Sequence, residues 1–277
     1  TLTTSGAAPA ELYYTDTQGP GRPVVLIHGW PASEKSWQPV ATALQQAGYR
    51  VIAYDRRGFG ASSHAQSGYD YDTFAADLAA LLNELDLVDA VLVGFSMGGG
   101  EVARYVADHG SGRITAAAFI AAITPALDAD LPDNPDGGFT HEAASGMQAA
   151  MRSDAEAFLT QFLTNFYSVP TAGDSTLMVP EQQIIESLQV ARQASPEALV
   201  RSIALWLTDF RTDLAALDVP TLVIHGDGDQ IVPFEASGKR MPQYVGQAEV
   251  KLIEKGPHGL LASHPAEVAR ALLDFLA

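Results

Sequence analysis

The chain of 277 residues contains no cysteine, which excludes disulfides, thiolate metal sites and a cysteine nucleophile. Basic residues are scarce: 16 lysines and arginines stand against 33 aspartates and glutamates, a formal net charge of −17. That charge repels phosphate backbones and anionic lipid, so we expect neither a nucleic-acid nor a membrane partner. No apolar run approaches the roughly 18 residues that a membrane-spanning helix needs.

What is present indicates one large globular unit. Apolar residues make up 47% of the chain and charged residues 18%, an ordinary mixture for a folded protein. The length fits a single large α/β domain. The first ten residues lack the basic and then apolar pattern of a secretory signal, so a cytoplasmic location is the default expectation.

Short β-branched runs alternate with helical patterns along most of the chain. The runs lie at 24–27, 50–54, 90–93, 117–121, 221–225 and 249–253. Runs that are apolar on both faces and alternate with helices predict a mostly parallel sheet flanked by helices. In such sheets ligands bind beyond the carboxyl ends of the strands, where glycines and polar residues gather in this sequence.

One region breaks the alternation. Between about residues 128 and 219 the pattern is helical, interrupted by prolines and glycines, with no convincing strand. A structureless loop of that length is improbable. We therefore predict an α/β core of residues 1–127 and 220–277, with a helical cap at 128–219 inserted into it.

A candidate nucleophile follows the run at 90–93. Gly94-Phe95-Ser96-Met97-Gly98 lies between that predicted strand and a helical pattern at 99–108, the setting of a G-x-S-x-G nucleophile elbow. A turn this sharp strains the serine backbone and requires small neighbours. The alternative is a glycine-rich turn with a capping serine, and the strand-to-helix context favours the nucleophile, Ser96.

A serine hydroxyl needs an imidazole base, and the imidazole needs a carboxylate on its other nitrogen. Of the seven histidines, His258 is the best candidate, because it follows the last predicted strand. Asp227 and Asp229 both follow the run at 221–225. We favour Asp229 as the acid and expect Asp227 to stabilise the turn; the order Ser96, Asp229, His258 is the one expected for an α/β-hydrolase.

Two backbone N–H groups should stabilise the oxyanion of an acyl-transfer reaction. One is expected from Met97, the residue after the nucleophile. The other is expected from the loop after the first run, where Pro31 has no N–H and Trp30 is therefore the donor. The alternative is that Trp30 only packs.

These motifs resemble a known family: the cofactor-free, non-haem haloperoxidases (perhydrolases) of the α/β-hydrolase superfamily, with their esterase and γ-lactamase relatives. The similarity runs through segments 28–31, 54–60, 69–78, 94–105 and 256–261. It covers both halves of the core closely and the cap only loosely. Gly99 departs from the family, which often carries threonine there, and we expect it to open space behind the elbow. The pair Asp227-Gly228 is a second departure.

The resemblance implies a serine hydrolase without metal or other cofactor, whose acyl-enzyme is attacked by water or by hydrogen peroxide. Peroxide attack would release a peracid that oxidises halide in solution, and Pro31 is similar to the haloperoxidase-type members. The implied substrate is a small ester or carboxylic acid, and relatives often form homo-oligomers.

A substrate pocket is expected around Trp30 and Met97. Its further wall would consist of Ile231 and Val232 from the core and Phe158, Phe162 and Trp206 from the cap, although these three aromatics would equally suit the interior of the cap. Two other functions stay open: an amide, lactam or C–C bond hydrolase with the same triad, and a non-catalytic binding protein on this fold.

Overall fold

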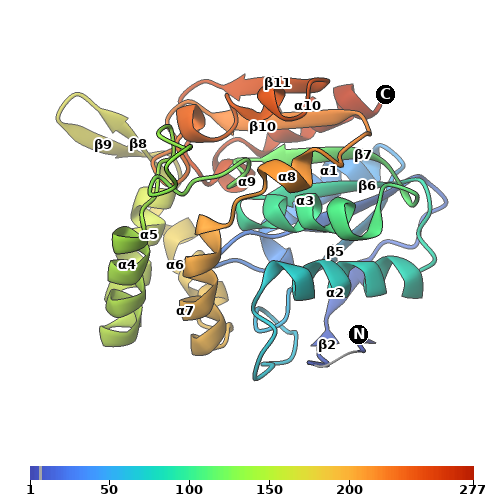
Figure 1. Cartoon of the computed structure of the whole chain (residues 1–277), viewed down its shortest axis with the longest axis horizontal. Coiled ribbons are helices and arrows are strands. Elements are labelled where there is room, and N and C mark those ends of the chain that lie inside the picture. The colour runs from blue at the N-terminus through green and yellow to red at the C-terminus, as the bar shows by residue number, and fades with distance from the viewer. Residues whose placement is uncertain (6–7) are drawn as a thin grey trace.

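The computed structural model describes residues 1–5 and 8–277. Its centre is a sheet of seven strands in the order β11-β10-β7-β6-β4-β5-β3 (Figure 1). All neighbouring pairs are parallel except β3 with β5. The strands are β3 (Tyr14–Asp16), β4 (Pro23–Ile27), β5 (Arg50–Tyr54), β6 (Ala90–Phe95), β7 (Ile114–Ile120), β10 (Thr221–Gly226) and β11 (Ala248–Ile253).

The predicted sheet is confirmed. Each of the six predicted runs overlaps one strand, and β6 and β10 are buried along their whole length, as strands covered on both faces must be. The antiparallel edge strand β3 was not predicted. A second, two-stranded sheet pairs β1 (Leu2–Thr3) with β2 (Glu11–Leu12).

Helices cover both faces of the central sheet. One layer holds α1 (Gln38–Gln46), α9 (Leu260–Ser263) and α10 (Pro265–Leu276); the other holds α2 (Tyr71–Glu84), α3 (Met97–His109) and α8 (Arg211–Leu214). The start of α2 is set by Asp70, whose side chain accepts a hydrogen bond from the Thr73 N–H. Short 3₁₀ turns are η1 (Glu34–Trp37), η2 (Leu205–Leu207), η3 (Phe234–Ala236) and η4 (Met241–Gln243).

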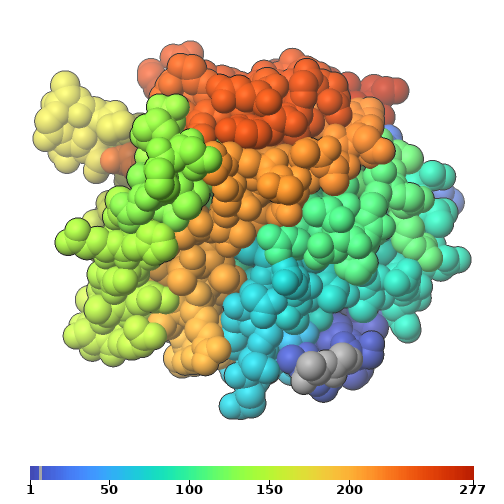
Figure 2. Space-filling view, viewed as in Figure 1, coloured from blue at the N-terminus to red at the C-terminus, as the bar shows by residue number. Residues whose placement is uncertain are grey.

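The inserted region between β7 and β10 is largely helical. Its helices are α4 (His141–Ser153), α5 (Ala155–Phe166), α6 (Glu181–Ala191) and α7 (Pro196–Ala204), which lie together at one side of the sheet in Figure 1. The expectation of no strand in this region was wrong. A hairpin of β8 (Ser168–Thr171) and β9 (Asp174–Leu177) projects from the body (Figure 2), and Gly173, at φ +92°, allows its tight turn.

The parallel strands bring their carboxyl ends to one edge of the sheet. The segments that follow β4, β6 and β10 carry Trp30, Ser96 and Asp229, and the segment after β11 carries His258. Among the helices of the described residues, none is long and apolar enough to cross a membrane.

Candidate active site

Ser96 occupies a strained turn between β6 and α3, with φ 53° and ψ −120°. A methyl group at Gly94 would lie 2.5 Å from the Gly98 carbonyl oxygen, and one at Gly98 would lie 2.4 Å from the carbonyl oxygen of Ile27. The turn therefore closes only with glycine on both sides of the serine. Strain in so tightly packed a turn is typical of a functional residue.

The three residues predicted as a triad form one chain of hydrogen bonds. His258 places Nε2 2.9 Å from the Ser96 Oγ and Nδ1 2.7 Å from the Asp229 Oδ2. The Asp229 Oδ1 accepts the N–H groups of Ile231 and Val232 at 2.9 and 2.8 Å. His258 and Asp229 are buried, and Ser96 is 5% exposed. This geometry lets the imidazole take the serine proton while the carboxylate orients the ring.

The surroundings of Asp229 keep it ionised. Burial alone would raise its pKa, but His258 and His225 beside it outweigh burial and hold the pKa of this carboxyl below its usual range. His225 places Nε2 3.3 Å from the Asp229 Oδ2. Sequence reasoning missed this contact, although a histidine four residues before the acid, at the end of a buried strand, was the available signal.

The competing candidates lie elsewhere. Asp227 is exposed, and its backbone N–H bonds the Ile253 carbonyl. Three of the other histidines, His64, His109 and His141, are exposed. His264 is half-buried, directly before α10, and its Nδ1 lies 2.8 Å from the Ser263 Oγ.

The two predicted oxyanion donors lie near Ser96. In the described part of the chain, neither the Met97 N–H nor the Trp30 N–H has a protein acceptor. The loop that carries Trp30 passes close to the nucleophile, because a methyl group at Gly29 would lie 2.8 Å from the Ser96 Cβ. Both groups are therefore available to a ligand oxygen at the N-terminal end of α3.

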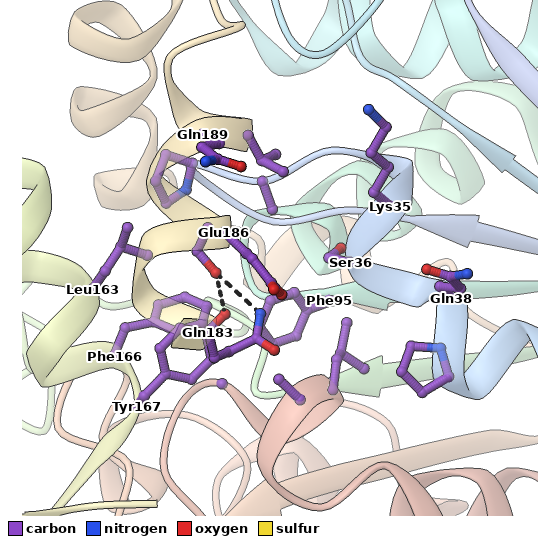
Figure 3. A pocket seen from close by; sticks show the side chains of 18 of the residues that line it. Lys35, Ser36, Gln38, Phe95, Leu163, Phe166, Tyr167, Gln183, Glu186 and Gln189 are labelled. Carbon is purple, nitrogen blue, oxygen red and sulfur yellow. Dashed lines mark hydrogen bonds between the residues drawn. The ribbon is translucent and has the colours of Figure 1, made fainter. Parts of the chain in front are cut away.

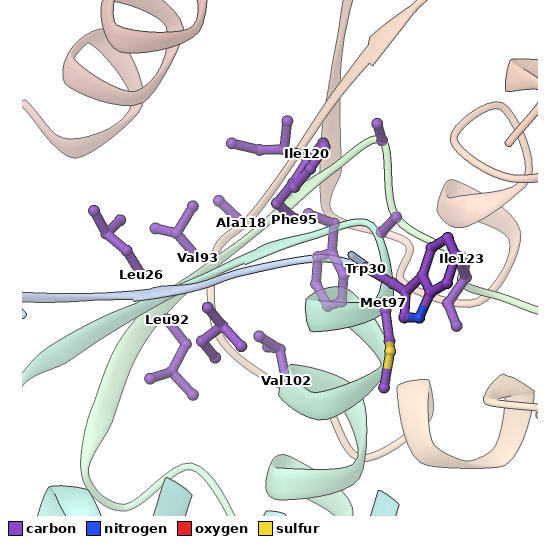
Figure 4. Close-up of a cluster of buried hydrophobic side chains, with 14 of the residues drawn as sticks. Leu26, Trp30, Leu92, Val93, Phe95, Met97, Val102, Ala118, Ile120 and Ile123 are labelled. Carbon is purple, nitrogen blue, oxygen red and sulfur yellow. The ribbon is translucent and has the colours of Figure 1, made fainter. Parts of the chain in front are cut away.

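The predicted pocket aromatics gather on the Trp30 side chain. Its ring lies 4.9 Å from that of Phe162, 5.3 Å from that of Trp206 and 6.4 Å from that of Phe158, between centroids. The Trp30 indole N–H also donates to the Leu199 carbonyl of α7 at 3.1 Å. Figure 4 shows the indole beside Met97 and Ile123, at the end of the buried cluster. The inserted region thus contacts the rest of the chain at the residue predicted as an oxyanion donor.

The other predicted pocket residues lie beside the triad acid, Asp229. Ile231 is half-buried and Val232 is buried, and both N–H groups bond Asp229. Gly99 opens no space behind the elbow, contrary to expectation: a methyl group there would lie 2.5 Å from the Ala122 Cβ and 3.2 Å from the Phe119 ring. Ala122, on the segment after β7, fills that position.

A cavity of about 400 Å³ lies between the inserted helices and the segments beside the central sheet (Figure 3). Its wall includes Pro31, Lys35, Leu163, Gln183 and Glu186, and none of the residues predicted to line the pocket. Phe95 and Phe166 separate it from the triad, because both rings line the cavity and both pack against the His258 imidazole, at 5.3 and 4.8 Å.

A buried ion pair lies beneath the site and was not predicted. The Arg56 Nε donates to the Glu101 Oε2 at 2.7 Å, and the Tyr54 hydroxyl bonds the other carboxylate oxygen. Arg56 also donates to the His28 carbonyl at 2.9 Å. The pair therefore ties α3, which begins at the nucleophile, to the loop that carries Trp30.

The fold and this site together define a class. Residues 22–265 match the family model described as the alpha/beta hydrolase fold, so the chain belongs to that family. The predicted family, fold and general function, a hydrolase of the haloperoxidase and esterase group, are confirmed.

Individual relatives show which members of the family this chain is similar to. The chain is 43% identical over 276 residues to a putative non-heme chloroperoxidase from Synechocystis sp., covering 100% of this chain and 98% of the relative. It is 32% identical to a bifunctional esterase/perhydrolase from Acinetobacter calcoaceticus, with 96% of each covered. A bromoperoxidase crystal structure from Bacillus anthracis superposes with a TM-score of 0.93 at 46% identity, covering 100% of this chain and 99% of that one.

Proposed function

We propose that this chain hydrolyses small carboxylic esters through an acyl-enzyme on Ser96 and that hydrogen peroxide can replace water as the acceptor. The observation that carries the proposal is the continuous hydrogen-bond chain from the Ser96 Oγ through both nitrogens of His258 to Asp229. The relatives named as chloroperoxidase and as esterase/perhydrolase support the choice of substrate and of acceptor.

In the first half-reaction the Ser96 Oγ attacks the ester carbonyl carbon and its proton passes to the His258 Nε2. The carbonyl oxygen becomes an oxyanion, which the Met97 and Trp30 N–H groups stabilise. When the tetrahedral intermediate collapses, the C–O bond to the alcohol breaks and the alcohol takes the proton from Nε2. Asp229 stays anionic throughout and holds Nδ1–H.

The second half-reaction repeats these steps with a different nucleophile. His258 removes a proton from water, or from hydrogen peroxide, and the resulting oxygen nucleophile attacks the acyl carbon. The ester bond to Ser96 breaks and the serine oxygen regains its proton from Nε2. Water releases a carboxylic acid and peroxide releases a peracid, which would then oxidise bromide in solution without further help from the protein.

The inserted region would shape the acyl side of the site. We propose that residues 128–219 act as a cap over the core of 1–127 and 220–277, meeting it at Trp30. The contacts that support this are the rings of Phe158, Phe162 and Trp206 around the Trp30 indole.

The test is the variant Ser96→Ala, assayed with p-nitrophenyl acetate and, with peroxide present, for peracid formation. We expect both activities to fall by at least about 10³-fold, since the residual rate would come from binding and oxyanion stabilisation alone. Fluorophosphonate labelling followed by peptide mapping should modify Ser96 in the parent protein and nothing in the variant. Unchanged turnover in a folded Ser96→Ala protein would refute the nucleophile assignment.

A further inference from the structure

His225 is a fully buried histidine at the end of β10 whose ring has one engaged and one unengaged nitrogen. Its Nε2 lies 2.8 Å from the Val232 carbonyl oxygen and 3.3 Å from the Asp229 Oδ2. Its Nδ1 is buried and has no partner among the described residues. A carbonyl oxygen only accepts hydrogen bonds, so Nε2 carries a hydrogen.

The N–H of this ring donates to the Val232 carbonyl of the turn that follows β10, and a carboxylate oxygen of the same turn lies close to the same nitrogen. The turn begins at Asp229 and ends at Val232, whose own N–H donates back to the Asp229 Oδ1 at 2.8 Å. The other carboxylate oxygen, Oδ2, faces His258 at 2.7 Å and His225 at 3.3 Å. Backbone groups thus hold one oxygen of the acid. His258 hydrogen-bonds the other oxygen, which also lies 3.3 Å from the His225 Nε2.

Packing keeps the His225 ring in this orientation. A methyl group at Gly238 would lie 2.7 Å from Nδ1, so the backbone passes directly against that nitrogen. The Phe234 ring packs nearby, with its centroid 5.6 Å from that of the imidazole. A ring confined in this way presents its Nε2–H in one direction, toward the Val232 carbonyl, with the Asp229 Oδ2 beside it.

We propose that His225 is a positioning residue for the triad: its Nε2–H fixes the 229–232 turn and directs the Asp229 Oδ2 toward His258. The inference rests on the proposed function, because it presumes that Asp229 is the triad acid. His225 touches neither the nucleophile nor, by this reasoning, the substrate, and it acts only through the carboxylate.

The test compares a variant without the donor to one that retains it. His225→Leu removes the N–H at similar volume, and His225→Gln keeps an N–H donor at similar reach. We expect kcat for p-nitrophenyl acetate to fall about 10-fold to 100-fold in His225→Leu, because a small displacement of the turn that carries the acid misaligns the reacting groups, with KM nearly unchanged. His225→Gln should recover most of that loss.

Circular dichroism and thermal unfolding separate positioning from folding. A merely structural role would lower the stability of both variants and leave kcat per folded molecule intact. If His225→Leu does not fold, His225→Asn takes its place: its shorter side chain cannot reach both acceptors, so its kcat should lie well below that of His225→Gln.

A double-mutant cycle with Asp229→Asn gives the decisive measurement. If His225 acts only through the carboxylate, adding His225→Leu to Asp229→Asn should change kcat by less than about 2-fold. The same loss in both backgrounds, or full activity of a folded His225→Leu, would overturn the proposal. Full activity of Asp229→Asn alone would instead reject the acid assignment, and an active Ser96→Ala the proposed function.

Discussion

Two strands of the sheet are followed or ended by the same dipeptide, His-Gly, on opposite sides of the nucleophile strand β6. His28-Gly29 follows β4, and His225-Gly226 ends β10. Both imidazoles are fully buried, yet they use opposite nitrogens. In His28 the Nε2 accepts the Arg56 N–H at 3.0 Å, and Nδ1 donates to the Gly29 carbonyl at 2.7 Å. In His225 it is Nε2 that donates.

The difference follows from the backbone group that faces each Nε2, an N–H donor at His28 and a carbonyl acceptor at His225, and the charges next to the two rings differ as well. Burial, and then the positive charge of Arg56, lower the pKa of His28 well below its usual range, so that ring stays neutral beside a cation. The Nε2 of His225 instead faces the Val232 carbonyl, an acceptor, and lies 3.3 Å from the anionic Asp229. The same side chain thus braces the oxyanion loop on one side of Ser96 and the triad acid on the other, with its tautomer set by its fixed partners.

The largest loss of activity should come from replacing the triad acid, Asp229. In Asp229→Asn the amide can no longer hold the imidazole with Nε2 free to accept the serine proton, so kcat should fall about 10³- to 10⁴-fold. The matched control is Asp227→Asn, two residues earlier and exposed, which should retain kcat within about 2-fold. Steady-state kinetics with p-nitrophenyl acetate measures both variants. A large loss of kcat in Asp227→Asn with little loss in Asp229→Asn would instead assign the role of triad acid to Asp227.

The pH dependence of kcat/KM tests the role of Asp229 without a substitution. Because the pKa of Asp229 is held below its usual range, this carboxylate stays ionised as pH falls and adds no proton to the acidic limb, which should therefore have a one-proton slope. The value of kcat/KM should therefore drop about tenfold per pH unit below the limb, roughly 100-fold over two units. A limb with a two-proton slope above pH 5 would show that a second group titrates.

Much of this acid side was predictable from sequence. Ser96, Asp229 and His258 each follow a strand of a parallel sheet, so their carboxyl-end positions could be predicted to converge. The brace at His225 could not be assigned, since a ring tautomer depends on partners that only the folded turn supplies. In the cap, four-residue strands on either side of Gly173 gave too short a pattern to be read as a hairpin.

The oxyanion side was less predictable because its contacts join distant segments. The ion pair of Arg56 and Glu101 spans 45 residues, and each partner in isolation reads as a surface charge. The wrong expectation at Gly99 has the same origin, because Ala122, which fills the space, belongs to a loop after a different strand. The cavity of about 400 Å³ likewise depends on where α6 packs. The periodicity of apolar residues in the sequence does not define that position.

In the loop that carries Trp30, a substitution of Gly29 should lower kcat more than a substitution of any side chain. In Gly29→Ala the new Cβ would lie 2.8 Å from the Ser96 Cβ and 3.0 Å from the Phe95 ring, so the loop must move away. Displacing one oxyanion donor should lower kcat about 10- to 100-fold. Gly112→Ala, at an exposed position with open space, is the control and should keep full kcat. Equal kcat values for the two variants would show that this loop does not contribute to the reaction.

The smallest effect should come from the link between this loop and the cap. Trp30→Phe keeps an aromatic ring and the backbone N–H but loses the hydrogen bond to the Leu199 carbonyl, so kcat/KM should fall only about 3- to 10-fold, as for one neutral hydrogen bond. Trp37→Phe is the matched control, because the buried Trp37 indole N–H has no partner within the described residues.

The size of the Trp30 effect decides how far the two sides of the site differ. A small loss would mean that the cap tunes the oxyanion loop from outside, whereas the acid side is fixed from within the core by His225. A loss near 10³-fold in a folded Trp30→Phe protein would contradict this, because it would equal the cost of losing an oxyanion donor outright although the substitution keeps the backbone N–H. The cap would then be as much a part of the reaction machinery as the turn at Asp229.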